Sequence, residues 1–156
     1  MRRRLSSLGL LTGQGAVRSL LEACHDGRLK GGLSVSLRAL PDELVGPLTL
    51  ALGGSARLLK VLDVRTGPPM VLEVQWRDVH EKWEVDGLEA LIHNLNDLLA
   101  PEADVAAAVV LGEWEDMLQV WCVPKAVLIR LLDSGLLAEA RNQAMLERLL
   151  PRDRAR

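Results

Sequence analysis

Residues 70–99 have the sequence MVLEVQWRDVHEKWEVDGLEALIHNLNDLL, in which the hydrophobic periodicity changes abruptly at Asp86. Before Asp86, apolar and polar residues alternate, as in a strand with one buried and one solvated face. After Asp86, leucine and isoleucine recur every three or four residues, which predicts an amphipathic helix over 87–99 with Asn94, Asn96 and Asp97 on its solvated side. We expect Asp86 to cap this helix, with Glu89 completing a capping box. Strands followed directly by a helix indicate a mixed α+β domain.

The segments on either side extend this pattern. Helical spacing predicts a first helix over 13–25, and alternation predicts strands over 33–37, 57–64 and 80–85. Because the ring of Pro47 clashes with a preceding helical turn, residues 48–52 are predicted as a strand, joined to 57–64 by a tight turn at Gly53 and Gly54. Beyond position 99, the pattern predicts strands over 105–111 and 117–123 and helices over 124–134 and 136–150.

The composition predicts one folded domain. The chain has 156 residues, of which 49% are hydrophobic and 26% are charged, as is typical of globular proteins. We expect a single α+β domain over residues 12–150, built on a mainly antiparallel sheet with helices packed mainly on one face. Residues 1–11 and 151–156, which are rich in arginine, are predicted to be flexible basic tails.

Several negative features bear on location. Cys24 and Cys122 lie far apart in the sequence and form neither a disulfide framework nor a CxxC metal motif. The apolar run near the start is too short for a secretory signal, and no segment approaches the roughly 20 apolar residues that cross a bilayer. The abundance of leucine, arginine, alanine and glycine, without phenylalanine or tyrosine, indicates a GC-rich bacterial genome. We therefore expect a cytoplasmic protein that binds no membrane and no cofactor.

The charge distribution limits nucleic-acid binding to the ends of the chain. The formal net charge is -2, so the protein has no broad basic field of the kind that general nucleic-acid binders use. The basic clusters are Arg2 to Arg4 at the start and Arg152, Arg154 and Arg156 at the end. Solvated tails explain these arginines, and contact with nucleic acid through the tails is the alternative.

An acidic pair on two neighbouring predicted strands raises a catalytic alternative. Asp63 faces the Glu73-Val74-Gln75 segment across a hairpin. In restriction-endonuclease-like nucleases, an acid at a strand end and a Glu-x-Lys on the next strand hold a divalent metal that activates water. Gln75 stands where the lysine would be, so the hypothesis is a degenerate metal-dependent nuclease. The other reading is that these residues are solvated strand faces.

A row of potential metal ligands lies along the predicted central helix. Glu89, His93 and Asp97 follow one another at four-residue spacing, which places them on one side of that helix. They could bind a metal ion only with further ligands from elsewhere, and a solvated helix face is the alternative.

The tryptophans are the leading candidates for binding. Tryptophan buries a large area while keeping a polar N–H, and Trp114 lies in a short acidic turn where burial is not expected. Trp83 is the second candidate, on a strand with a polar face. The alternative is that all four tryptophans fill a core that has no phenylalanine or tyrosine.

These observations predict a binding protein rather than an enzyme. From Arg57 onward, the predicted order of three strands, a helix, two strands and a helix is similar to that of secretion-chaperone-like domains. The resemblance implies pairing through a helix or sheet edge and binding of peptide segments. We expect a non-catalytic cytosolic protein-binding domain, adaptor or chaperone-like, that acts as a homodimer and engages a protein partner.

Overall fold

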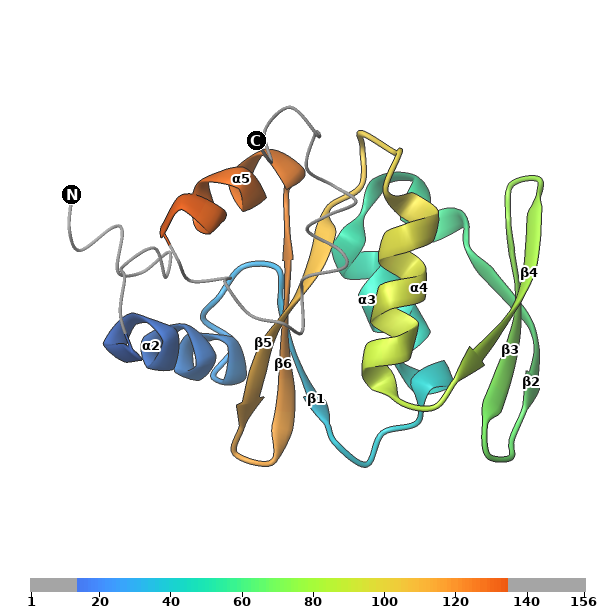
Figure 1. Cartoon of the computed structure of the whole chain (residues 1–156), viewed down its shortest axis with the longest axis horizontal. Helices are drawn as coiled ribbons and strands as arrows, with labels where there is room; N and C mark the ends of the chain where they lie inside the picture. Colours follow the sequence, from blue (N-terminus) through green and yellow to red (C-terminus); the bar gives the residue numbers. More distant parts are fainter. Residues whose placement is uncertain (1–13, 135–156) are drawn as a thin grey trace.

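The computed structural model describes residues 14–134, and it confirms the predicted single α+β fold (Figure 1). The predicted helix over 136–150 and both basic tails lie outside the described residues. The elements are α2 (Gln14–His25), β1 (Gly32–Ser36), α3 (Pro41–Leu52), the 3-10 helix η1 (Gly54–Leu58), β2 (Lys60–Arg65), β3 (Met70–Trp76), β4 (Val79–Val85), α4 (Leu88–Leu99), β5 (Ala107–Trp114), β6 (Met117–Val123) and α5 (Lys125–Ser134). None of the helices in this range has the length and hydrophobicity needed to span a membrane.

The strands form two antiparallel three-stranded sheets, in the orders β1-β6-β5 and β2-β3-β4. Helices α3 and α4 lie between the two sheets, and α2 packs on the other side of β1-β6-β5 (Figure 1). Helices therefore cover one face of β2-β3-β4, as predicted, and both faces of β1-β6-β5. In the described range, the outer face of β2-β3-β4 carries no helix.

The sequence of the strands explains these layers. Strands β5 and β6 are apolar on both faces, as expected for a sheet covered on both sides. The residues of one face pack with α2; they are Ala107, Val109, Trp121 and Val123. The residues of the other face join the larger core between the sheets; they are Ala108, Val110, Val120 and Cys122. In β3, by contrast, buried residues alternate with partly or fully exposed ones, so one face meets α3 and α4 and the other meets water.

The prediction of a strand over 48–52 was wrong, because these residues belong to helix α3 with Pro47 inside it. A proline within a helix costs about 3 kcal/mol through a lost hydrogen bond and a clash. The apolar stripe of this helix is buried, and each buried aliphatic side chain contributes about 1.5–3 kcal/mol; the stripe consists of Leu44, Val45, Leu48 and Leu52. Burial therefore outweighs the effect of proline. The predicted hairpin at Gly53 and Gly54 was also wrong, because these glycines connect α3 to η1.

Helix α4 confirms the prediction for 87–99 in its extent but not in its details. Its N-cap residue is Gly87 and no side chain caps it, so the predicted capping box of Asp86 and Glu89 is absent. Asn96, predicted to face solvent, is only 7% exposed. Its Nδ2 donates to the carbonyl of Ala108 at 2.8 Å, and its Oδ1 accepts from the Ala108 N–H at 3.0 Å. The amide thus pairs with the backbone of β5 as a neighbouring strand would.

Candidate functional site

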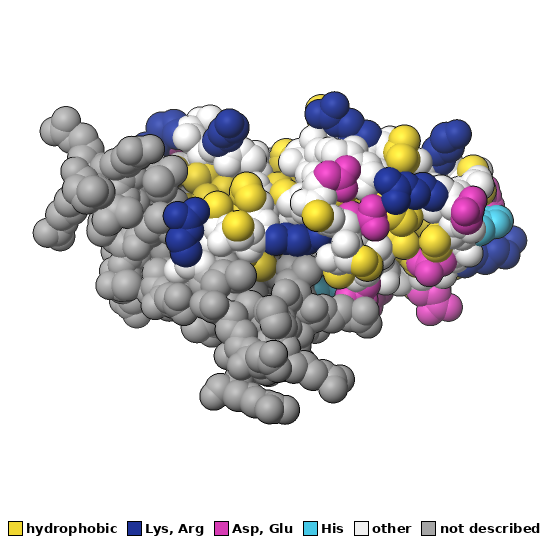
Figure 2. Space-filling view, turned by 90° about the horizontal axis from the view of Figure 1, so that it is seen from above, with side chains coloured by type: hydrophobic (Ala, Val, Ile, Leu, Met, Phe, Trp, Pro, Cys, Tyr) yellow, Lys and Arg dark blue, Asp and Glu magenta, His cyan; other side chains and the backbone are white. Residues whose placement is uncertain are grey.

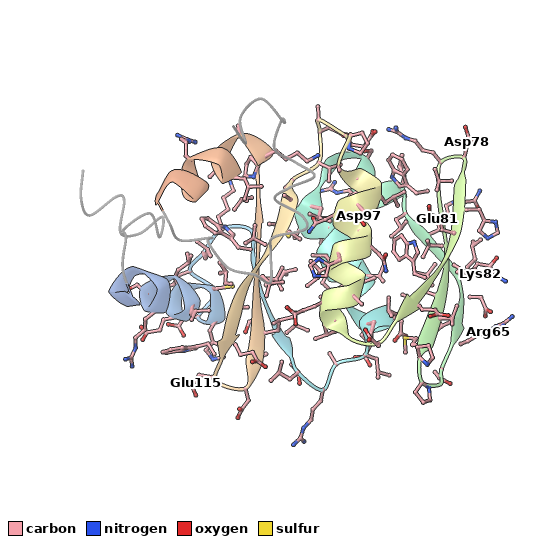
Figure 3. The ribbon with its side chains drawn as sticks, viewed as in Figure 1. Arg65, Asp78, Glu81, Lys82, Asp97 and Glu115 are labelled. Carbon is pink, nitrogen blue, oxygen red and sulfur yellow. The ribbon has the colours of Figure 1, made fainter. Side chains whose placement is uncertain are left out.

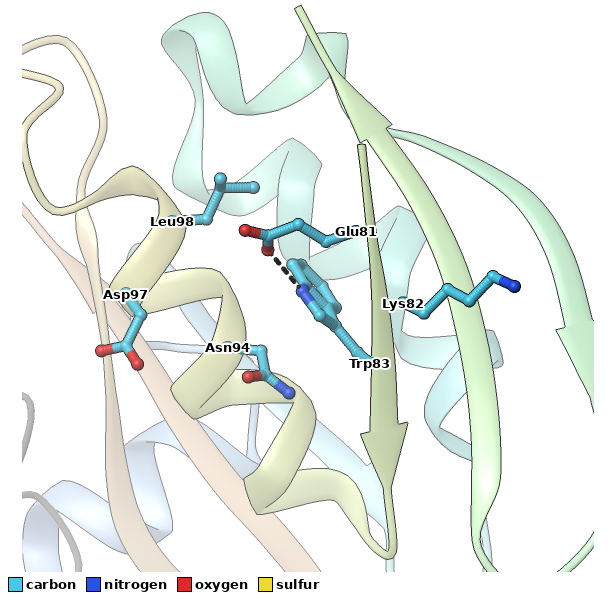
Figure 4. Close-up of a pocket in the computed structure, with 6 residues that line it drawn as sticks. All are labelled: Glu81, Lys82, Trp83, Asn94, Asp97 and Leu98. Atoms are coloured by element: carbon cyan, nitrogen blue, oxygen red, sulfur yellow. Dashed lines mark hydrogen bonds between the residues drawn. The ribbon is translucent and has the colours of Figure 1, made fainter. Parts of the chain in front are cut away.

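An open groove of about 540 Å³ lies between β4 and α4 (Figure 4). Strand β4 contributes Glu81, Lys82 and Trp83, and α4 contributes Asn94, Asp97 and Leu98. The side chains of Glu81 and Lys82 point in opposite directions, with Glu81 toward α4 and Lys82 away from it (Figures 3 and 4). The groove itself is therefore lined mainly by carboxylates, an amide and apolar surface.

Local structure places each of these residues. Glu81 and Trp83 are two positions apart on a strand, so both face α4, and Lys82 between them faces the solvent. Asn94, Asp97 and Leu98 are three and four positions apart on a helix, so they share one side of α4. The groove thus results from packing the inner side of β4 against one side of α4.

The groove favours a positively charged group. Trp83 is 6% exposed, and its indole N–H donates to Glu81 Oε1 at 2.8 Å, which fixes the carboxylate at the edge of the ring. Asp97 is exposed on the opposite wall. The Glu81 carboxylate at the groove attracts an ammonium or guanidinium group. An anion at the same place would be repelled by Glu81.

Among the strands that the structure describes, β4 also lies at the edge of β2-β3-β4. Trp76 pairs with Val79 across a two-residue turn, so every second pair from there exchanges backbone hydrogen bonds. By this alternation, the N–H and C=O groups of His80, Lys82 and Glu84 point away from β3. In residues 14–134, none of these groups bonds to the backbone of a turn or loop. By contrast, Asn96 occupies the edge of β5 at Ala108.

The residues of the nuclease hypothesis lie together on the outer face of β2-β3-β4. Asp63 lies directly opposite Glu73 in the strand register. The carboxylate of Glu73 pairs with His80 Nε2 at 2.5 Å, and the Gln75 amide reaches the Arg77 carbonyl at 3.5 Å. Over residues 14–134 no helix covers this strand face (Figure 1), and an open face offers little exclusion of water from a reacting group. The hypothesis stays a prediction, which a cleavage assay with Mg²⁺ or Mn²⁺ on the wild type and Glu73→Ala tests.

The proposed metal row is present as a row on the helix. Glu89, His93 and Asp97 fall within α4 at the predicted four-residue spacing. Among residues 14–134, no three His, Cys, Asp or Glu side chains are grouped so that they could hold a metal ion. Asp97 belongs instead to the wall of the groove.

The four tryptophans differ in their surroundings. Trp76, Trp83 and Trp121 are buried, and the indoles of Trp76 and Trp121 donate to the carbonyls of Ser55 and Lys30 at 2.7 and 3.0 Å. Trp114 is half-buried, and the Arg18 guanidinium lies over its ring at 5.3 Å from the centroid. Of the two predicted binding residues, Trp83 therefore borders a groove and Trp114 is covered in part by α2.

Both cysteines are buried and lie on opposite faces of β1-β6-β5. Cys24 lies on α2 and faces the sheet, and Cys122 lies on β6 and faces the core next to α3 and α4. Burial raises the pKa of the Cys24 thiol to about 11 and that of Cys122 to about 12. Because the thiolate is the reactive form, neither thiol acts as a nucleophile near neutral pH.

Sequence reasoning missed Glu81 and Asn94 as site residues. A signal for Glu81 was available, because this charged residue is in phase with Trp83 and Val85 on the apolar face of its strand. Asn94 has no comparable signal, since its role depends on which side of α4 meets β4.

The exposed large hydrophobic side chains lie in one stretch of the sequence, outside the groove. Within residues 18–128, the large hydrophobic side chains that are exposed all lie between positions 37 and 62; they are Leu37, Leu40, Leu50, Leu58 and Leu62. This segment comprises α3, η1 and the first residues of β2.

Charged side chains of both signs, with hydrophobic ones between them, are spread over the described part of the face in Figure 2. That face therefore shows no continuous basic surface for nucleic acid.

In comparisons with known proteins, no family model, no curated protein and no solved structure matches this chain.

Proposed function

We propose that the chain is a non-catalytic protein-binding domain, adaptor or chaperone-like in its action, that forms a homodimer through the α3 side. The observation that carries this proposal is that, within residues 18–128, the exposed large hydrophobic side chains all lie between positions 37 and 62. Single exposed leucines are normal on soluble proteins, but several on consecutive elements are typical of a contact surface. We therefore assign this segment to binding.

The outer side of α3 supports this assignment. An ordinary surface helix has charged residues on its solvent side. On α3, the exposed positions are Glu43, Gly46, Pro47 and Leu50, so beyond Glu43 this side carries no charge. Small residues allow close approach of another surface, and Leu50, which is 64% exposed, supplies the apolar area. A twofold dimer would bury the same patch of both subunits against each other.

Sedimentation of the full chain from low to high micromolar concentration tests the proposal. We expect a dimer for the wild type and a monomer for Leu50→Glu, because each charge would be desolvated in a twofold interface. The matched control is Ala126→Glu, which adds the same charge at an exposed position of α5. Circular dichroism should show that both variants are folded. A wild type that stays monomeric throughout would disprove the homodimer.

A further inference from the structure

We propose that the β4–α4 groove binds an extended segment of a partner protein, which pairs with the edge of β4 and places a lysine or arginine side chain against Glu81. The inference rests on the proposed protein-binding function and identifies the chemistry of the partner. It does not depend on dimer formation, because the leucines assigned to the dimer lie on other elements.

The backbone of β4 can pair with an added strand. Its N–H and C=O groups at His80, Lys82 and Glu84 point away from β3, so an added strand can bond to them and extend β2-β3-β4. Strand β4 spans seven residues, enough for a short extended segment. A helical ligand would leave these backbone groups without partners.

The side chains that line the groove select a basic residue in the added strand. In paired strands, neighbouring side chains point to the same face. A residue of the added strand beside Glu81 therefore points toward α4, where Asn94 and Asp97 form the opposite wall. A guanidinium there can bond to the Glu81 carboxylate, which the Trp83 N–H holds in place. An aspartate or glutamate at that position would face the like charge of Glu81.

The outer positions of the added strand are under little constraint. They would lie beside His80, Lys82 and Glu84, whose charges are mixed. The preferred segment is thus an alternating one, with basic residues toward α4 and residues of many kinds outward. This defines a partner by charge and conformation rather than by a fixed sequence.

The test is an NMR titration of the full chain with two capped peptides, one alternating threonine and arginine and the other alternating threonine and glutamate. We expect the arginine peptide to shift the indole N–H resonance of Trp83 and to slow hydrogen exchange at His80, Lys82 and Glu84. The indole resonance of Trp121, buried under α2, should stay in place. The glutamate peptide should leave all of these signals unchanged.

Matched variants separate the two halves of the proposal. Glu81→Gln should raise the Kd for the arginine peptide about threefold or more, because it removes a partner charge. Glu84→Gln, which makes the same charge change on the outer face of β4, should leave the Kd unchanged. Lys82→Pro removes an N–H that β3 does not use, so the protein should fold but lose binding, whereas Lys82→Ala should bind normally.

Each outcome decides one point. Equal Kd values for Glu81→Gln and Glu84→Gln would disprove the charge pairing, and normal binding by Lys82→Pro would disprove strand addition. Failure of the arginine peptide to bind would overturn this inference, while sedimentation of the same sample decides the homodimer independently. If the protein without peptide shows concentration-dependent protection at His80, Lys82 and Glu84, the occupant is a second copy, and the inference of another partner is wrong.

Discussion

Replacing Asn96 with alanine is expected to lower the free energy of unfolding by about 2–4 kcal/mol, although the residue is polar and lies on a helix. Its amide makes two hydrogen bonds to Ala108, which is 1% exposed. The substitution leaves one buried N–H and one buried C=O without partners. Each such group costs about 1–3 kcal/mol, which gives the range above after allowance for partial relaxation.

Asn96→Asp sharpens this prediction because it makes the effect depend on pH. A neutral aspartic acid can still donate to the Ala108 carbonyl and accept from its N–H, whereas the carboxylate can only accept and is buried beside a carbonyl oxygen. The pKa of this carboxyl should therefore be raised in the folded state. The folded chain then binds more protons than the unfolded chain, so stability is lost as pH rises above about 4 toward neutrality.

Urea unfolding followed by tryptophan fluorescence, at several pH values, measures both effects. The matched control is Asn94→Ala on the same helix, which should change the free energy of unfolding by less than about 1 kcal/mol because the residue borders open space. If Asn96→Ala cost no more than Asn94→Ala, or if Asn96→Asp lost no stability between pH 4 and pH 7, the pairing of α4 with β5 would have no energetic role.

Three further predictions concern turns and caps. Glu115 has a φ of 55°, so Glu115→Asn should raise the free energy of unfolding by about 0.5–1 kcal/mol, and a decrease in urea unfolding would contradict this. A hydrogen bond from the Ser55 N–H holds the pKa of Asp104 below its ordinary value, so stability present above about pH 4 is lost as pH falls. Asp104→Asn should therefore flatten the acid side of the stability profile, and an unchanged slope would argue against it. The Lys125 ammonium donates to three carbonyls at the end of α4, so Lys125→Met should cost about 1–3 kcal/mol and speed hydrogen exchange in the last turn of that helix; unchanged exchange there would refute the cap.

The sequence predicted elements whose periodicity is strong and local. The alternation in β3 and β4 and the leucine stripe of α4 each fit one secondary structure only, so their boundaries agree with the structure to within a few residues. The α3 segment could not be predicted in this way. The local rule for Pro47 favours a break, and the compensating burial depends on neighbours that are distant in the chain.

The division into two sheets was beyond local pattern for a similar reason. Strand β1 pairs with β6, which follows it only after two α-helices, the 3-10 helix η1 and four strands. Nothing in the sequence of either strand identifies the other as its partner. The site was predicted in part. Trp83 and Asp97 were singled out, but for separate roles, because their meeting in one groove requires the packing of α4 against β4.

Because of their positions, Cys24 and Cys122 can serve as native probes of unfolding. Each thiol lies beneath a different layer on either side of one sheet, and neither is accessible in the folded protein. A thiol reagent that labels Cys24 first would report detachment of α2 alone, whereas simultaneous labelling of both would mean that the layers open as one cooperative unit. Mass spectrometry of partly labelled molecules can therefore resolve how the layers separate without any introduced probe.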